Sequence, residues 1–174
     1  MNFSPRLVRS TFLAVERRIT LAAVVLGSVC LVFAALAGLY QVIARFVLFT
    51  AASWSEPFIQ AALIWMTYLA LAGAMRTGTL ISVDLLLTLV GGRTKAGVRA
   101  FTTLAVMSLL LVIFWFGCIL VWRVQFQTIA GLNISASWIY AALPVGAVIS
   151  MLALVAHQID PPPDNDNAAL ESGG

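Results

Sequence analysis

Four long stretches that are nearly free of charged side chains dominate this sequence of 174 residues. A helix needs roughly 20 apolar residues to cross the roughly 30 Å of hydrocarbon in a bilayer, and each stretch approaches or exceeds that length. Hydrophobic residues make up 61% of the chain and charged residues 10%, whereas about 25% of a soluble domain is charged. We therefore predict an all-α integral membrane protein, a single membrane domain over residues 1–159 with four spans. The spans are expected at about residues 19–44, 58–76, 98–122 and 138–157.

Two further segments are expected to lie outside the spans. Residues 80–90 are apolar but number only about 11 and include Asp84, so we expect a short interfacial or re-entrant helix after span two rather than a fifth crossing. Three prolines follow Asp160 and end the last helix, because proline cannot continue one. The polar sequence beyond has no apolar periodicity, and residues 160–174 are predicted to form a disordered acidic tail.

The lysines and arginines are divided unevenly among the connections, and such residues concentrate in cytoplasmic connections. The amino-terminal segment and the connection between spans two and three carry four each, while the other two connections carry one each. In that order they are Arg6, Arg9, Arg17 and Arg18; Arg76, Arg93, Lys95 and Arg99; Arg45; and Arg123. We therefore expect both termini in the cytoplasm. The basic residues face lipid head groups in this arrangement, so the pI of 9.3 does not predict nucleic-acid binding.

The segment before span one alternates apolar and basic residues at near-helical spacing. This pattern predicts an amino-terminal amphipathic helix on the cytoplasmic surface of the membrane. A frayed continuation of span one explains the same residues equally well, and the sequence leaves both interpretations open.

The residues that usually carry chemistry are scarce. No ionisable side chain falls in the middle of a predicted span, although transporters commonly place their ion and substrate sites there. The two cysteines, Cys30 and Cys118, form no CxxC motif, and the single histidine, His157, has no partner ligand in view. We therefore predict no catalytic, cofactor or metal site, and the sequence does not favour a complete transporter.

Small residues recur at helical spacing within the spans, and such residues let membrane helices approach closely. They are Ala142, Gly146 and Ser150 in span four, Ala70 and Ala74 in span two, and Ala34 and Gly38 in span one. Packing within the chain and contact with another subunit explain them equally well. Pro144 lacks a backbone donor and predicts a bend in span four.

Polar residues gather at two boundaries of span two. Ser55 and Glu56 precede Pro57 on the predicted outer side, where capping of the helix is enough to explain them. On the cytoplasmic side, Arg76 and Asp84 flank a turn. They are expected to pair across it, or Asp84 caps the short helix that follows.

The order of these features resembles the small permease subunit of TRAP transporters (tripartite ATP-independent periplasmic transporters), the DctQ-like family. The resemblance covers about residues 16–158. It rests on Arg45-Phe-Val, Trp54-Ser-Glu56, Leu63-Ile-Trp65, Arg76-x-Gly78-x-x-Ile81-x-Val83-Asp84-Leu-Leu86, Ala130-Gly-Leu-Asn-Ile134 and Trp138-Ile-Tyr140-Ala-Ala-Leu-Pro144-Val-Gly146.

The resemblance implies a small, non-catalytic subunit of the bacterial or archaeal inner membrane. Such a subunit scaffolds a large permease subunit in sodium-driven uptake of an organic acid, which a periplasmic binding protein delivers. The implied partners are these two proteins and membrane lipids. Candidate partner-binding residues are Arg45, Trp54, Glu56, Arg76, Asp84, Tyr140 and Pro144. The alternative is a structural or assembly subunit of another membrane complex.

Overall fold

The computed structural model describes residues 5–50, 53–77 and 94–160, and these residues are helical apart from short connections. Four helical segments, Thr11–Phe46, Ser55–Thr77, Ala100–Arg123 and Ser137–Ile159, are long and apolar enough to cross a membrane. The predicted all-α fold with four helices of membrane-spanning length is therefore confirmed. The helices are α1 (Pro5–Phe46), α2 (Ser55–Thr77), α4 (Thr94–Arg123), α5 (Ser137–Tyr140) and α6 (Ala142–Ile159). The expected interfacial helix over residues 80–90 and the expected disorder beyond residue 160 lie outside the described residues.

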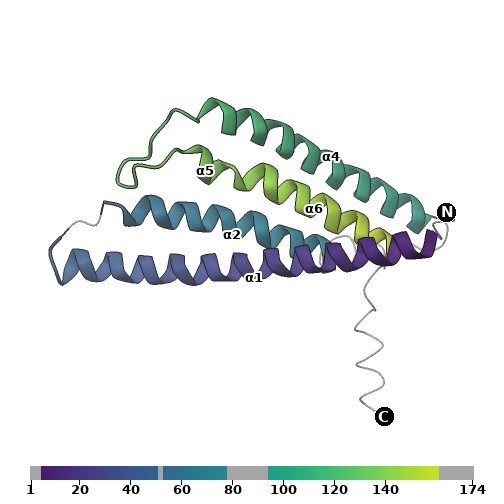
Figure 1. Ribbon diagram of the computed structural model, residues 1–174, viewed down its shortest axis with the longest axis horizontal. Helices are drawn as coiled ribbons and strands as arrows, with labels where there is room; N and C mark the ends of the chain where they lie inside the picture. Colours follow the sequence, from purple (N-terminus) through teal and green to yellow (C-terminus); the bar gives the residue numbers. More distant parts are fainter. Residues whose placement is uncertain (1–4, 51–52, 78–93, 161–174) are drawn as a thin grey trace, which may run out of the picture.

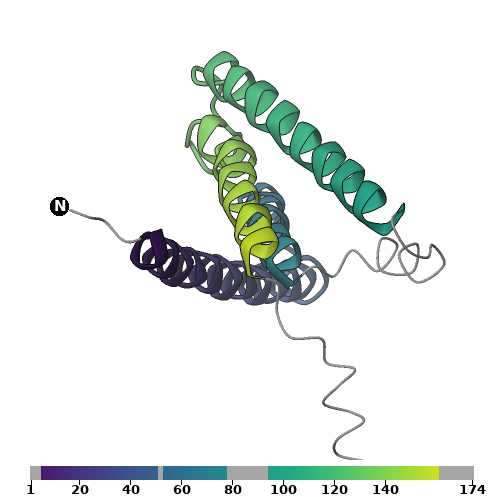
Figure 2. The ribbon, with the colours of Figure 1, turned by 90° about the vertical axis from the view of Figure 1, so that its right-hand side faces the viewer.

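The helices pack mainly with their spatial neighbours. α1 lies along α2, α2 lies along α6, and α6 also contacts α1 and α4 (Figure 1). Within the described residues, the backbone of α4 approaches only those of α5 and α6. Seen from the end, α4 stands apart from α1 and α2 (Figure 2). The fold is therefore a three-helix unit of α1, α2 and α6, with α4 attached along one side.

α1 is one continuous helix of 42 residues, about 63 Å long at 1.5 Å per residue. Span one is thus the later part of a longer helix. A separate amphipathic helix at its amino terminus is not confirmed, because residues 5–18 continue span one without a break. After Pro5 the segment contains no proline that would end the helix, so the continuation describes this part of the chain.

Small residues line the side of α1 that faces the other helices. Its buried side chains include Ala23, Ala34, Ala37 and Ala44, which recur at spacings compatible with one helix face. Gly27 joins them, because a Cβ there would lie 3.4 Å from Leu69 Cβ of α2. The large aliphatic residues of α1 point away from the protein, so its packing relies on close backbone approach rather than on interlocking side chains.

α2 and α6 approach each other at Gly146, where a Cβ would lie 2.5 Å from Tyr68 Cβ and 2.8 Å from its carbonyl oxygen. Ala142, Gly146 and Ser150 are all buried, so the small residues of span four pack within the chain. In α2, by contrast, Ala70 is exposed. The buried positions there are Ser55, Leu69, Ala72 and Met75, so Ala70 does not pack within the chain, and the alternative of contact with another subunit stays a prediction for it.

The helix of span four is interrupted at Ala141, between α5 and α6 and three residues before Pro144; a bend at this point stays a prediction. The indole Nε1–H of Trp65 donates a hydrogen bond to the carbonyl oxygen of Trp138 at 3.1 Å, and so satisfies an acceptor next to the interruption. α4 meets this region at Gly117, where a Cβ would lie 3.0 Å from Pro144 Cδ. Glycine is needed there to let α4 reach the proline ring.

At the end where α1 meets α2, the two connections touch. Gly131 has a φ of +93°, and a Cβ there would lie 2.6 Å from the carbonyl oxygen of Ser53. The connection between α4 and α5 folds back on itself through a bridge between Thr128 and Ser135. Glycine thus serves both a left-handed turn and a close contact between the connections.

Candidate functional site

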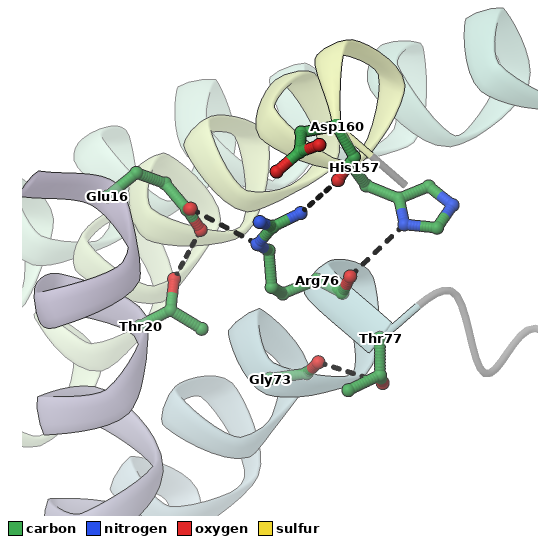
Figure 3. A network of polar contacts seen from close by, with 7 residues as sticks. All are labelled: Glu16, Thr20, Gly73, Arg76, Thr77, His157 and Asp160. Atoms are coloured by element: carbon green, nitrogen blue, oxygen red, sulfur yellow. Dashed lines mark hydrogen bonds and ion pairs between the residues drawn. The ribbon is translucent and has the colours of Figure 1, made fainter. Parts of the chain in front are cut away.

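A group of polar side chains joins the three-helix unit at the end where α1 begins and α6 ends. Glu16 of α1 is 2% exposed and its Oε2 lies 3.2 Å from Arg76 Nε of α2. Thr20, one turn further along α1, donates a hydrogen bond from Oγ1 to Glu16 Oε1 at 2.8 Å. Figure 3 shows the carboxylate between these two partners. We call Glu16, Thr20, Arg76, His157 and Asp160 the inner polar cluster.

Arg76 also connects α2 to the end of α6. Its Nη1 donates to the carbonyl oxygen of Asp160 at 2.9 Å. The carbonyl oxygen of Arg76 lies 3.1 Å from His157 Nδ1, and since a carbonyl only accepts, this hydrogen bond requires the proton on Nδ1. Arg9 of α1 donates from Nη2 to the carbonyl oxygen of Ile159 at 2.6 Å. The end of α6 is therefore bound to α1 through Arg9 and to α2 through Arg76, whose contacts with Asp160 and His157 are drawn in Figure 3.

The pairing of Glu16 with Arg76 explains how a carboxylate is held in a largely apolar protein. A buried charge is costly unless it is paired and hydrogen-bonded. Glu16 Oε1 accepts from Thr20, whereas Oε2 meets Arg76 as an ion pair and accepts no well-aligned hydrogen bond among the described residues. Arg76 keeps 20% of its side chain exposed and so retains part of its solvation.

The candidate partner-binding residues fall into separate places. Arg45 lies in the last turn of α1 and Glu56 in the first turn of α2, and both are exposed. Arg76 lies in the inner polar cluster at the opposite end of α2. Tyr140 and Pro144 are half-buried beside the α5–α6 interruption. These residues therefore do not form one site.

Trp54 is part of an aromatic group next to Arg45 and Glu56. Its ring centroid lies 5.7 Å from that of Tyr40 and 6.3 Å from that of Phe58, and the second pair is edge-on. Trp54 nevertheless remains 42% exposed. This position, at the ends of α1 and α2, is typical of the aromatic belts that mark membrane interfaces.

The expected pairing of Arg76 with Asp84 lies outside the described residues, because Asp84 is not among them. The partner that the structure gives to Arg76 is Glu16, which sequence reasoning missed. Glu16 precedes predicted span one, in the segment for which a surface helix and a continuation of span one were both left open. The signal available was the spacing from Glu16 to Thr20 and Ala23, which places a carboxylate on the small-residue side of α1.

Among the described residues, no three His, Cys, Asp or Glu side chains are grouped so that they could hold a metal ion. The inner polar cluster instead joins groups of opposite charge and completes hydrogen bonds between helices. Its geometry is that of a structural connection. The fold and this cluster together define a multi-pass helical membrane protein whose buried polar groups hold its helices together.

Comparison with known proteins places the chain more narrowly. Residues 34–161 match the family model described as "Tripartite ATP-independent periplasmic transporters, DctQ component". The match covers well over half of the sequence, and the chain belongs to this family, the small permease component of TRAP transporters. No individual curated protein matches the chain. The matched region includes Arg76 but begins after Glu16.

Proposed function

We propose that this chain is a non-catalytic scaffold for the large permease subunit of a TRAP transporter in the inner membrane. In this proposal the complex takes up an organic acid with sodium, and a periplasmic binding protein delivers the substrate. Membership of the DctQ family supports the transport role. The observation that carries the scaffold role is the pairing of Glu16 with Arg76. This ion pair uses the buried carboxylate and its counter-charge to hold α1 and α2 together, which is a structural role.

The outer surfaces of the helices support the same proposal. Large apolar side chains are exposed along most of α1 and α4, including Leu36 at 58% and Trp115 at 63%. A protein that works through its surfaces leaves such faces for lipid and for neighbouring subunits. The lateral position of α4 widens the three-helix unit (Figure 2), which suits a subunit that widens the fixed part of a transporter.

We assign contact with the binding protein to the end that carries Arg45, Trp54 and Glu56. Two connections pack together there through Gly131 and Ser53. Contacts between the two connections therefore hold this surface in place. Both charged residues are exposed. In this proposal the end lies in the periplasm and both termini lie in the cytoplasm, which the uneven distribution of basic residues supports.

Reconstituted uptake tests the proposal. Proteoliposomes are prepared with this chain alone, with the large permease alone and with both, and loaded binding protein and an inward sodium gradient are then applied. We expect uptake from the pair only, and we expect it to require the binding protein. Sodium-driven uptake by this chain alone, or equal uptake by the large permease without it, would contradict the proposal.

A further inference from the structure

The outer side of α4 is the face that the rest of the chain leaves uncovered. α4 packs on α6 through Leu110 and Gly117, which are buried. The opposite side carries large exposed side chains: Phe101, Leu104, Leu111, Trp115, Ile119 and Trp122. Since α4 stands at the edge of the molecule (Figure 2), this side faces the membrane or another protein.

A hollow of about 430 Å³ lies in this side, toward the end of α4. It is open and is lined by Trp115, Cys118, Ile119, Trp122 and Arg123. Its walls are mainly apolar, and one guanidinium stands at the end nearest the membrane boundary. A concave surface of this kind fits a protruding side chain.

The depth of Trp115 in the membrane helps to decide whether lipid or another protein covers this side of α4. The span Ala100–Arg123 has its midpoint between Leu111 and Val112, so Trp115 lies about 5 Å from the middle of the membrane at about 1.5 Å per residue. Helical side chains lean toward the amino-terminal end, which carries the Trp115 indole away from the nearer interface. Belt tryptophans, by contrast, lie at head-group level.

The indole N–H of Trp115 has no hydrogen-bond acceptor among the described residues, and the side chain is 63% exposed. Lipid tails offer no acceptor, and leaving a polar group unpaired in hydrocarbon is costly. Exposed positions near the middle of predicted span one, such as Val32 and Phe33, have side chains without an N–H or O–H group. The outer side of α4 therefore differs from α1 in requiring a polar group from whatever covers it.

We propose that the outer side of α4 docks a transmembrane helix of the large permease subunit. One side chain of that helix fills the hollow, and a carbonyl or hydroxyl oxygen at mid-membrane depth accepts the Trp115 N–H. Val32 and its neighbours on α1 face lipid. This inference rests on the proposed function, since the large permease is the partner assigned there.

Photocrosslinking in the assembled complex tests this docking surface. Benzoylphenylalanine is introduced at position 115 in one variant and at position 32 in a depth-matched control, and both are coexpressed with the large permease. We expect position 115 to give at least tenfold more adduct with the large permease than position 32. Adducts of position 115 with lipid alone, or with a second copy of this chain, overturn the assignment.

A conservative substitution tests the hydrogen bond. Trp115→Phe keeps the ring and removes the N–H, and we expect it to weaken copurification of the large permease about threefold to tenfold, the effect of one neutral hydrogen bond. Trp138→Phe removes an N–H from an exposed tryptophan of α5 that lies outside this docking surface, near the membrane boundary where water and head groups supply acceptors, and should leave copurification unchanged. Equal effects of the two substitutions refute the proposed acceptor. If the unaltered chain fails to copurify, the proposed function itself is wrong.

Discussion

The ion pair between Glu16 and Arg76 makes a prediction whose size follows from its geometry. At 3.2 Å and an effective dielectric constant near 20, the attraction between the two charges is about 5 kcal/mol, and part of it offsets the loss of hydration. Arg76→Met leaves the buried Glu16 carboxylate unpaired, which costs about 3–5 kcal/mol. Glu16→Gln keeps an acceptor for Thr20 and leaves Arg76 partly solvated, so we expect a smaller loss of about 1–2 kcal/mol.

The double variant removes both charges and should be about as stable as Glu16→Gln, or slightly less stable. A cycle of the four proteins then gives a coupling energy of about 3–5 kcal/mol if the double variant matches Glu16→Gln, and about 2–4 kcal/mol if it is less stable by about 1 kcal/mol. The hydrogen bond from Arg76 to the Asp160 carbonyl is lost in both Arg76 variants and cancels in the cycle. Stability is measured as the free energy of unfolding in mixed micelles of rising SDS fraction, followed by tryptophan fluorescence.

Additive effects of the two substitutions, within about 0.5 kcal/mol, would refute the reasoning, because independent sites show no coupling. The matched control is Glu56→Gln at the opposite end of α2. Glu56 is exposed, and removing its charge should change the free energy of unfolding by no more than about 0.5 kcal/mol.

The same unfolding measurement tests three further substitutions. Gly146→Ala places a Cβ against the backbone of Tyr68 and should cost about 1–3 kcal/mol as α2 and α6 separate; an unchanged stability would show that the helices are further apart. Trp65→Phe removes the donor to the Trp138 carbonyl and should cost about 1–3 kcal/mol, and no loss would mean that another donor takes its place. Ser150→Ala removes a buried hydroxyl that has no partner among the described residues; stability should stay the same or rise by about 1 kcal/mol, and a clear fall would reveal a hydrogen bond.

The spans could be predicted from the sequence because crossing a bilayer leaves a strong one-dimensional signal. An uncharged run of sufficient length needs no knowledge of its neighbours. The bend predicted from Pro144 rests on a similarly local signal, the missing backbone donor of proline. The family resemblance, which rests on the order of short motifs, was confirmed by the match over residues 34–161.

The inner polar cluster could not be predicted because its members are distant in the sequence. Asp84 is an acidic residue close to Arg76 in the sequence. Glu16, by contrast, is 60 residues away, in the segment for which a surface helix was one of two interpretations. The same limitation applied to the segment before span one, because an amphipathic pattern fits a separate helix and a continued one alike. Which alanine of α2 faces inward also depends on the neighbouring helices, so the sequence left open whether Ala70 packs within the chain or against another subunit.

The way in which α4 is attached has a consequence for how the chain tolerates change. The polypeptide leaves the unit of α1, α2 and α6 after Thr77 and returns to it at Ser137, so α4 and its connections amount to an insertion between two parts of one folded unit. The contacts of Glu16 with Arg76, and of Arg76 with Asp160, close that unit without any atom of α4. We therefore expect substitutions on the outer side of α4 to alter assembly with a partner, while α1, α2 and α6 keep their own stability. The residues that evolve for recognition are then different from those that maintain the fold.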